Sequence, residues 1–523
     1  MLETTVGALF HRAVSHYAGR VAVKHGSRAL SYAELGEQVN RLANAVVGLG
    51  LHHGERVGLL MWNCIEYVVC DFAAATAGLV KVPLNHLLTR DEVQFRLLDS
   101  ETAAVICDEY FAPMVEELSG SCPSLRHRIC VTDGGRRAPA GFTAFADLLA
   151  AGAARDPGVA VGHEDLLGIM YTGGTTGRSK GVMHTHKSVL AIVFSEMLEM
   201  DVGHGEVMLQ VAPLPHATQF MLLPGFLRGG THVLMKKFDP EDVLRTIERE
   251  RVSWTFMVPT MIYVLLDDPA LGTYDHGTLR TVIYGAAPMS PDKLEGAIAR
   301  VGPVFLQIYS QMEVANQTTS LTKADHVEAL ARARHRLGSC GRPIAMAQVR
   351  IADENDTDVP IGEPGEILTR GPHMMRGYWR RDEETAKTLR GGFIHTGDVA
   401  RADEDGFIYI VDRAKDMIIS GGMNVYSVEV ENVLMEHPVV REACVIGVPD
   451  DKWGEAVTAF VVCREGAGVE SADLIAFSGR KLAAYSRPKT VEFVAEIPKT
   501  PYGKMDKKAI RARFWKGEGR QVH

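Results

Sequence analysis

Hydrophobic residues in the first third of the chain follow helical and strand-like spacings in turn. Ser31 and Glu34 form a capping-box pattern, after which apolar residues recur on one helical face as far as Leu49. The run at 55–62 then predicts a buried strand, and a helical stretch near Tyr67–Ala77 follows it. Three further runs predict strands: VKVPL (80–84), AAVIC (103–107) and RICV (128–131). Thr89 and Glu92 form a second capping pair. Strands separated by helices of this length predict parallel sheets with helices on both faces.

The pattern changes twice further along the chain. From about residue 165 to 321 the alternation continues, with Gly- and Pro-rich loops at strand ends, where open α/β sheets bind ligands. From about Gly338 the predicted segments are shorter and extended, and Asp405-Gly406 predicts a hairpin turn. From Met417 we expect a small α+β domain. Its predicted strands are ACVIGV, VTAFVVC and VEFVAEI, and its predicted helices are Val428–Glu436 and Ala472–Ala484.

These patterns predict an α/β protein. A large N-terminal domain would hold parallel-rich sheets with flanking helices and a β-rich subdomain, and a small α+β domain would end the chain. The 523 residues are 46% hydrophobic, which suffices for a large core.

Charge and cysteine usage narrow the class of protein. The formal net charge is -9, which argues against nucleic acid or an anionic membrane as the main partner. The eight cysteines stand singly, without a CxxC pair, as is typical of reduced thiols. No apolar run is long enough for a membrane span, and the first residues lack a signal-peptide pattern. We expect a soluble, cytoplasmic enzyme.

A Gly-rich loop, YTGGTTGRSKG at 171–181, follows the apolar run LLGIM and precedes a plausible helix. Its glycines allow close backbone approach to an anion, and its hydroxyls together with Lys180 add donors for phosphate oxygens. The Walker pattern requires Lys directly after the second Gly, where this loop has Arg178. The sequence therefore predicts a phosphate loop of another type.

This loop resembles the signature loop of the adenylate-forming superfamily, which includes acyl- and aryl-CoA synthetases. Further matching motifs follow in the family's order: PLPH (213–216), YGAAP (284–288), QIYSQME (307–313), GEILTRGP with GYW (365–379), HTGD (395–398), DRAKDMIISGGMNVY (412–426) and PKTPYGKMDKK (498–508). The resemblance implies a ligase that forms an acyl-AMP from ATP and a carboxylic acid and then transfers the acyl group to coenzyme A. It also implies Mg²⁺, which suits a carboxylate ligand beside phosphates.

The resemblance assigns roles to individual residues. Lys504 corresponds to the catalytic lysine that bridges the acyl carboxylate and the α-phosphate, and Glu313 to the magnesium ligand. Asp398 corresponds to the carboxylate that accepts the ribose hydroxyls, and Arg413 also contacts the ribose. His216 corresponds to a group near the acyl carbonyl. The remaining candidates are the phosphate-loop residues Thr172, Gly173, Gly174, Thr175 (counted as catalytic), Thr176, Gly177 and Lys180, and the adenine-slot residues Gly285, Ala286, Ala287, Gln307 and Tyr309.

The second half-reaction implies a mobile C-terminal domain. In the family this domain rotates about a hinge, and the hinge position corresponds here to Lys415, so that we expect domains at 1–414 and 416–523. Gly421 and Gly422 match glycines beside the tunnel for the pantetheine arm, although an ordinary β-turn would also explain them.

Four positions depart from the family's pattern. Gly173 replaces a serine, and Ile308 and Ser310 replace glycines at the wall of the acyl pocket. Met312 replaces a threonine whose hydroxyl donates to the adenylate phosphate, and a thioether cannot donate. Losing a hydrogen bond to a charged group costs roughly 1.5–3 kcal/mol, so adenylation is expected to be weakened.

Several alternatives stay open. A ligase that loads a carrier-protein thiol shares every motif, and a degenerate homologue would only bind nucleotide. HATQFMLLP contains no acidic residue, which argues against an amino acid as the substrate. The stretch QFMLLPGFLRGG favours a hydrophobic acid, and the protein is expected to be a monomer or a homodimer.

Lys504→Ala is expected to abolish acyl-AMP formation while thioester formation from supplied acyl-AMP largely persists. Lys504 would neutralise charge only in the first half-reaction, because domain rotation removes it before the thiol arrives. Pyrophosphate exchange and thioester formation, measured separately, check this. Equal loss of both steps would contradict the role.

Overall fold

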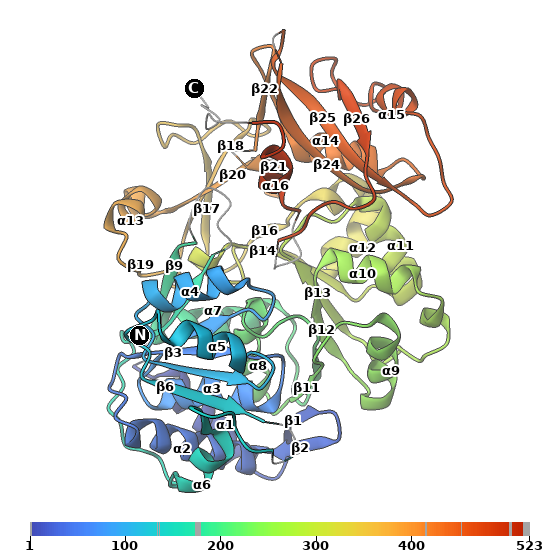
Figure 1. The fold of residues 1–523 in the computed structure, drawn as a ribbon. Coiled ribbons are helices and arrows are strands. Elements are labelled where there is room, and N and C mark those ends of the chain that lie inside the picture. The colour runs from blue at the N-terminus through green and yellow to red at the C-terminus, as the bar shows by residue number, and fades with distance from the viewer. Residues whose placement is uncertain are drawn as a thin grey trace.

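The computed structural model describes residues 3–132, 134, 136–172, 179–413, 416–450, 452–500 and 505–515. These residues form four sheets, two large and mostly parallel, two smaller and mostly antiparallel. The two large sheets and their helices make up the lower part of the molecule in Figure 1, and the C-terminal segment lies above them. The predicted α/β class, with a large N-terminal part and a smaller C-terminal part, is confirmed.

The first large sheet has the strand order β16-β15-β14-β13-β12-β10-β11-β1-β2. Its central strands β11, β10, β12, β13 and β14 run parallel, so their carboxyl ends meet at one edge. The bounds are β1 (Val21–His25), β2 (Arg28–Ser31), β10 (Val207–Gln210), β11 (Thr231–Leu234), β12 (Trp254–Met257), β13 (Thr281–Gly285), β14 (Phe305–Tyr309), β15 (Thr319–Leu321) and β16 (Arg342–Pro343).

The second large sheet has the order β19-β9-β8-β4-β3-β5-β6-β7. Its bounds are β3 (Arg56–Leu60), β4 (Val80–Leu84), β5 (Ala104–Asp108), β6 (His127–Val131), β7 (Thr143–Ala144), β8 (Leu166–Tyr171), β9 (Gly181–Thr185) and β19 (Gly377–Tyr378). The parallel strands expected at 55–62, 80–84, 103–107 and 128–131 are confirmed. A helix follows the Gly-rich loop as expected, α7 (His186–Glu199), but strand β9 lies between them and pairs antiparallel with β8.

Helices cover both large sheets, as expected. They are α1 (Val6–His16), α2 (Tyr32–Gly48), α3 (Ile65–Thr76), α4 (Arg90–Asp99), α5 (Ala112–Ser119), α6 (Phe145–Ala151), α7 (His186–Glu199), α8 (Leu222–Leu227), α9 (Pro240–Glu250), α10 (Pro259–Asp267), α11 (Pro291–Val301), α12 (Lys323–Arg332) and α13 (Asp382–Thr388). Both predicted capping boxes are present, at the starts of α2 and α4. Phe10 of α1 stacks on Phe72 of α3 with ring centroids 4.2 Å apart, and Phe226 of α8 meets both rings edge-on.

The third sheet, β17-β18-β20-β21, is the expected β-rich subdomain. Its strands are β17 (Gln348–Ala352), β18 (Gly365–Arg370), β20 (Ile394–Ala402) and β21 (Ile408–Arg413). The hairpin expected at Asp405-Gly406 joins β20 to β21, and Gly406 has a φ of 80°. Only glycine adopts this backbone readily, which explains the turn.

The C-terminal segment forms the fourth sheet, with β22 (Ile418–Ser420), β23 (Met423–Val425), β24 (Val440–Asp450), β25 (Gly454–Cys463) and β26 (Thr490–Phe493). Its helices are α14 (Ser427–Met435), α15 (Ser471–Ser478) and α16 (Lys507–Arg511). Two elements are shorter than expected. Helix α15 ends before Gly479, a residue that weakens helices, and turns follow it as far as Ser486. Strand β26 ends at Phe493, where its register with β25 also ends.

Hydrogen bonds and ion pairs of charged side chains connect segments on either side of the expected hinge. The backbone N–H of Ser427 donates to Asp412 over 2.5 Å, and Lys507 contacts Glu431 over 2.7 Å. Arg511 pairs with Asp416 over 2.6 Å. Lys415 lies outside the described residues, so the division into domains at this position stays a prediction.

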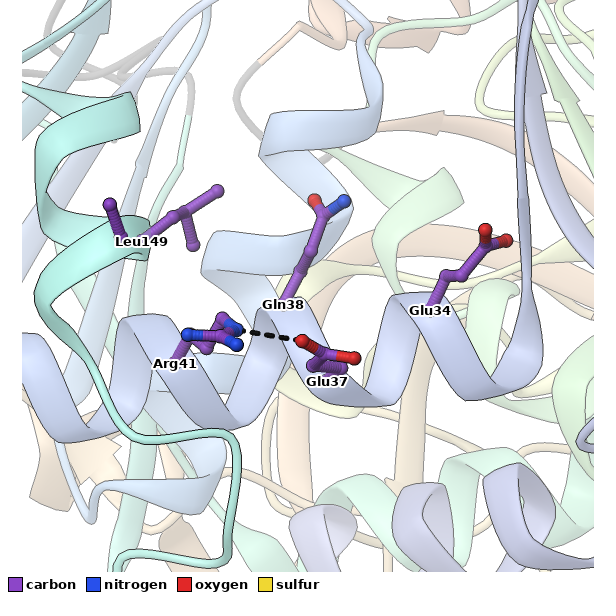
Figure 2. A pocket seen from close by; sticks show the side chains of 6 residues that line it. Glu34, Glu37, Gln38, Arg41 and Leu149 are labelled. Atoms are coloured by element: carbon purple, nitrogen blue, oxygen red, sulfur yellow. Dashed lines mark hydrogen bonds and ion pairs between the residues drawn. The ribbon is translucent and has the colours of Figure 1, made fainter.

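A hollow of about 470 Å³ lies between α2 and α6, at the end of the molecule remote from the C-terminal segment (Figures 1 and 2). Glu37 and Arg41 on its floor pair with each other over 2.8 Å. The other side chains around it are Glu34, Gln38, Leu149 and Ala150. In the described part of the chain, no helix is both long and apolar enough to cross a membrane.

Candidate active site

Asp398 is the centre of the candidate site. It lies on β20 directly opposite Arg413 of β21, and the Arg413 Nε atom is 3.1 Å from Asp398 Oδ1. The hairpin register therefore brings the two predicted ribose contacts together. Asp398 is 4% exposed, so its charge depends on protein partners.

Two residues at the end of β14 complete the surroundings of Asp398. The Tyr309 hydroxyl and the Gln311 Nε2 atom donate to Asp398 Oδ2 over 2.8 Å and 2.6 Å. Burial and the neighbouring carboxylate raise the pKa of Tyr309, so its hydroxyl keeps its proton and donates. A carboxylate has about four lone-pair sites, and these three contacts use three of them. Asp398 thus joins the carboxyl edge of the first sheet to the third sheet.

Glu313 lies on a 3₁₀ turn, η4 (Met312–Val314), that follows β14. Its Oε1 atom accepts from the Tyr378 hydroxyl over 2.6 Å. The Lys180 ammonium lies 4.1 Å from the centre of the same Tyr378 ring. Tyr378 therefore brings the predicted magnesium ligand and the phosphate-loop lysine to one place.

The two ends of the phosphate loop are held together. Thr172 N–H donates to the Lys180 carbonyl over 3.0 Å, and the Ser179 hydroxyl donates to the Thr172 carbonyl. These bonds extend the pairing of β8 and β9 by one step beyond Tyr171 and Gly181. The other loop candidates lie outside the described residues: Gly173, Gly174, Thr175, Thr176 and Gly177.

The predicted adenine-slot residues stand at the carboxyl ends of β13 and β14. A Cβ atom on Gly285 would lie 2.4 Å from the Ile308 carbonyl oxygen, so only glycine permits this strand spacing. Ala286 has a φ of 66°, a left-handed conformation that turns the chain away at the strand end. Gln307 accepts from the Tyr284 hydroxyl over 3.4 Å, and Ala287 follows the turn.

His216 and Met312 lie in the loops between these strands and the helices. His216 is half-buried, and its carbonyl accepts from the Gln219 Nε2 atom over 3.0 Å. The Met312 carbonyl accepts from His184 Nε2 over 2.8 Å. Burial lowers the pKa of His184 to about 4, so its ring is neutral at pH 7. The Met312 side chain packs against an apolar cluster of Val182, Val314, Met375, Tyr378 and Ile394.

For four candidates the structure tests the predicted role less directly or not at all. Gly421 and Gly422 form the two-residue turn between β22 and β23, with φ of 60° and 78°. This turn type needs left-handed residues at both positions, so the turn itself explains the glycines, and a role beside coenzyme A stays a prediction. Lys504 and Lys415 lie outside the described residues.

Sequence reasoning missed Gln311, Tyr378 and Glu366 as site residues. Glu366 Oε1 accepts from Gly397 N–H over 2.7 Å and so fixes the turn before Asp398. All three stand within motifs that were recognised (QIYSQME, GYW and GEILTRGP), so the signal was present. Their contacts depend on strand register, which motif spacing does not supply.

Magnesium fits this donor set. Mg²⁺ is commonly held by one or two carboxylates together with substrate phosphates. Glu313 supplies one carboxylate beside the phosphate-loop lysine. Within the described ranges, no group of three or more His, Cys, Asp or Glu side chains could hold a metal.

Comparison with known proteins gives consistent matches over nearly the whole chain. A family profile described as AMP-binding enzyme matches residues 10–379, and one described as AMP-binding enzyme C-terminal domain matches 429–504. The chain is 40% identical to a feruloyl-CoA synthase of Amycolatopsis sp over 94% of this chain and 96% of that protein. It is 38% identical to a medium/long-chain-fatty-acid–CoA ligase of Mycobacterium tuberculosis over 99% of this chain and 91% of that protein.

Among solved structures, the amide bond synthetase McbA from Marinactinospora thermotolerans is similar at a TM-score of 0.88 and 33% identity. The match covers 97% of this chain and 100% of that chain.

Met312→Thr is expected to raise the rate of pyrophosphate exchange and to lower the thermal midpoint of unfolding. The new hydroxyl would donate to the phosphate where charge develops, and restore part of ~1.5–3 kcal/mol. The loss of the thioether removes contacts with the apolar cluster at Tyr378.

Met312→Leu is the matched control, because it keeps an apolar side chain and adds no donor. Exchange should not rise in this variant. Unchanged exchange in Met312→Thr would mean that Gln311, a loop hydroxyl or water already satisfies the phosphate. A fall in exchange would mean that the Met312 side chain belongs to the substrate pocket instead.

Proposed function

The chain belongs to the AMP-binding enzyme family, and we propose that it joins a hydrophobic carboxylic acid to the thiol of coenzyme A through an acyl-AMP. The observation that carries this proposal is the Asp398 cluster, in which Tyr309, Gln311 and Arg413 hold one buried carboxylate at the carboxyl edge of the first sheet. Two relatives, a feruloyl-CoA synthase and a fatty-acid–CoA ligase, are named as ligases that use coenzyme A.

In the first half-reaction, a carboxylate oxygen of the acid attacks the α-phosphorus of ATP. The bond between the α-phosphorus and its bridging oxygen breaks, and pyrophosphate leaves. Such a step needs charge neutralisation and alignment more than covalent help from the protein. Lys180 would donate to phosphate oxygens, and Lys504 is proposed to bridge the two reactants. Glu313 would hold Mg²⁺, which neutralises phosphate charge when it is bound.

Asp398 would orient the nucleotide. Its carboxylate is held in place by Tyr309, Gln311 and Arg413, so it can accept ribose hydroxyls without rearrangement. The chain turn at Ala286 would leave backbone groups at the edge of the adenine ring.

In the second half-reaction, the thiolate of coenzyme A attacks the acyl carbonyl carbon. The bond to the AMP oxygen breaks, and AMP leaves. Rotation about Lys415 is proposed to bring Gly421 and Gly422 towards the carbonyl. The contacts of Asp412 with Ser427, and of Arg511 with Asp416, flank this position and would resist or guide the rotation.

The direct test uses purified protein with ATP, Mg²⁺, coenzyme A and a panel of hydrophobic acids. We expect equimolar AMP, pyrophosphate and acyl-CoA with at least one acid. Asp398→Asn should raise the KM for ATP by about tenfold or more, because it removes the charge that orients the ribose.

Asp405→Asn, in the exposed turn of the same hairpin, is the matched control and should retain the KM of the parent protein. Thioester formation with a carrier protein but not with coenzyme A would reassign the acceptor. The absence of both AMP and thioester would contradict the proposed function.

A further inference from the structure

A second group of polar side chains is buried beside the His216 loop. Ser195 and Glu196 lie near the end of α7, Gln219 ends the short helix η2 (Ala217–Gln219), and Asn316 and Gln317 follow the turn that carries Glu313. Each of the five is at most 8% exposed. Burial of five polar side chains in one place is costly unless hydrogen bonds compensate them.

Hydrogen bonds link four of these residues in two pairs, and Gln219 bonds to the His216 loop. Asn316 Nδ2 donates to Glu196 Oε1 over 2.6 Å and to the Ala217 carbonyl over 3.0 Å. The Ser195 hydroxyl donates to Gln317 Oε1 over 3.0 Å. Helix α7 is therefore tied to the segment after Glu313 and to the loop after His216.

Three atoms of this group remain unused. Glu196 Oε2, Gln219 Oε1 and Gln317 Nε2 are buried and have no hydrogen-bond partner among the described residues. A buried polar atom without a partner costs about 1–3 kcal/mol. Folded proteins pair most such atoms, so three on segments that are tied together point to a ligand that completes them.

The chemistry of the three atoms defines the ligand group. Gln219 Nε2 donates to the His216 carbonyl, which leaves its Oε1 as an acceptor. Glu196 offers an oxygen and Gln317 offers an N–H. The ligand group that pairs with all three atoms must therefore both donate and accept hydrogen bonds. A hydroxyl does both.

The ligand group that meets these three atoms is neutral rather than cationic. Burial raises the pKa of Glu196 to about 8, so the carboxyl is largely protonated at pH 7. The segments that carry Glu196 and Gln219 are otherwise apolar: Val193, Leu214, Phe220 and Leu222 are all buried in the same hydrophobic cluster. The ligand therefore combines a hydroxyl with an apolar body.

We propose that Glu196, Gln219 and Gln317 are specificity-determining residues that bind a hydroxyl group on the apolar body of the acid. The proposal rests on the proposed function, since it places this hydroxyl beside the His216 loop of the acyl site. It selects hydroxylated hydrophobic acids over their plain counterparts. A site built to hydrogen-bond a hydroxyl rejects analogues without it, because its own polar atoms then stay unpaired.

The test measures kcat/KM for thioester formation with matched acids: cinnamate against its ortho-, meta- and para-hydroxy derivatives, and decanoate against hydroxydecanoates. The parent protein should prefer at least one hydroxylated acid by about tenfold or more. Glu196→Leu should reduce this preference to near unity, mainly through KM. Glu196→Gln should retain much of it, because the amide keeps the Asn316 bond and a polar atom for the hydroxyl.

Glu199→Gln is the matched control, one turn further along α7, where the carboxylate accepts from Ala345 N–H over 3.0 Å. It should leave the preference unchanged. The ratio of two acids is taken within each variant, so a change in stability does not alter it.

Three outcomes would overturn the inference. They are equal use of plain and hydroxylated acids by the parent protein, a preference that survives Glu196→Leu, and selection of an acid with an ammonium group. The first outcome would mean that only water hydrogen-bonds to the three atoms. In each case thioesters still form, so the proposed function stands; if no acid gives AMP, the proposed function itself is wrong.

Discussion

One buried carboxylate, Asp398, connects the parts of the site. Its two oxygens are held by a tyrosine and a glutamine from the end of β14 and by an arginine from the neighbouring strand β21. A charge that is 4% exposed is tolerated only with such partners. The need to satisfy it fixes how the third sheet sits on the carboxyl edge of the first. Glu313, four residues beyond the end of β14, is linked through Tyr378 to Lys180.

Much of the fold followed from the sequence because its signals are local. The capping boxes at Ser31 and Thr89 and the turn at Gly406 depend on neighbouring residues only, and all three are present. The buried strands of the second sheet are continuous apolar runs of ordinary strand length. Strand β9, between the Gly-rich loop and helix α7, was not expected, because periodicity does not show that Gly181–Thr185 pairs back onto β8.

The site was predictable as a set of motifs but not as a set of contacts. The motifs named Asp398, Arg413, Glu313 and Tyr309. In the structure Arg413 and Tyr309 contact Asp398, whereas Glu313 contacts Tyr378. They did not show that Gln311 and Tyr378 hold the carboxylates, since those bonds join residues 65 to 87 positions apart. The group at Glu196 was also missed, because a single Glu on an apolar helix carries no periodic signal. Only its unpaired oxygen distinguishes it.

The central claim is that the acid is activated as an acyl-AMP in the site around Asp398. The most direct measurement uses an acid labelled with oxygen-18 in its carboxylate, with ATP, Mg²⁺ and coenzyme A, followed by mass spectrometry of the products. If an acyl-AMP forms, one labelled oxygen passes to AMP when the thiol displaces it. Label in inorganic phosphate, with ADP as the nucleotide product, would show an acyl phosphate and contradict the claim.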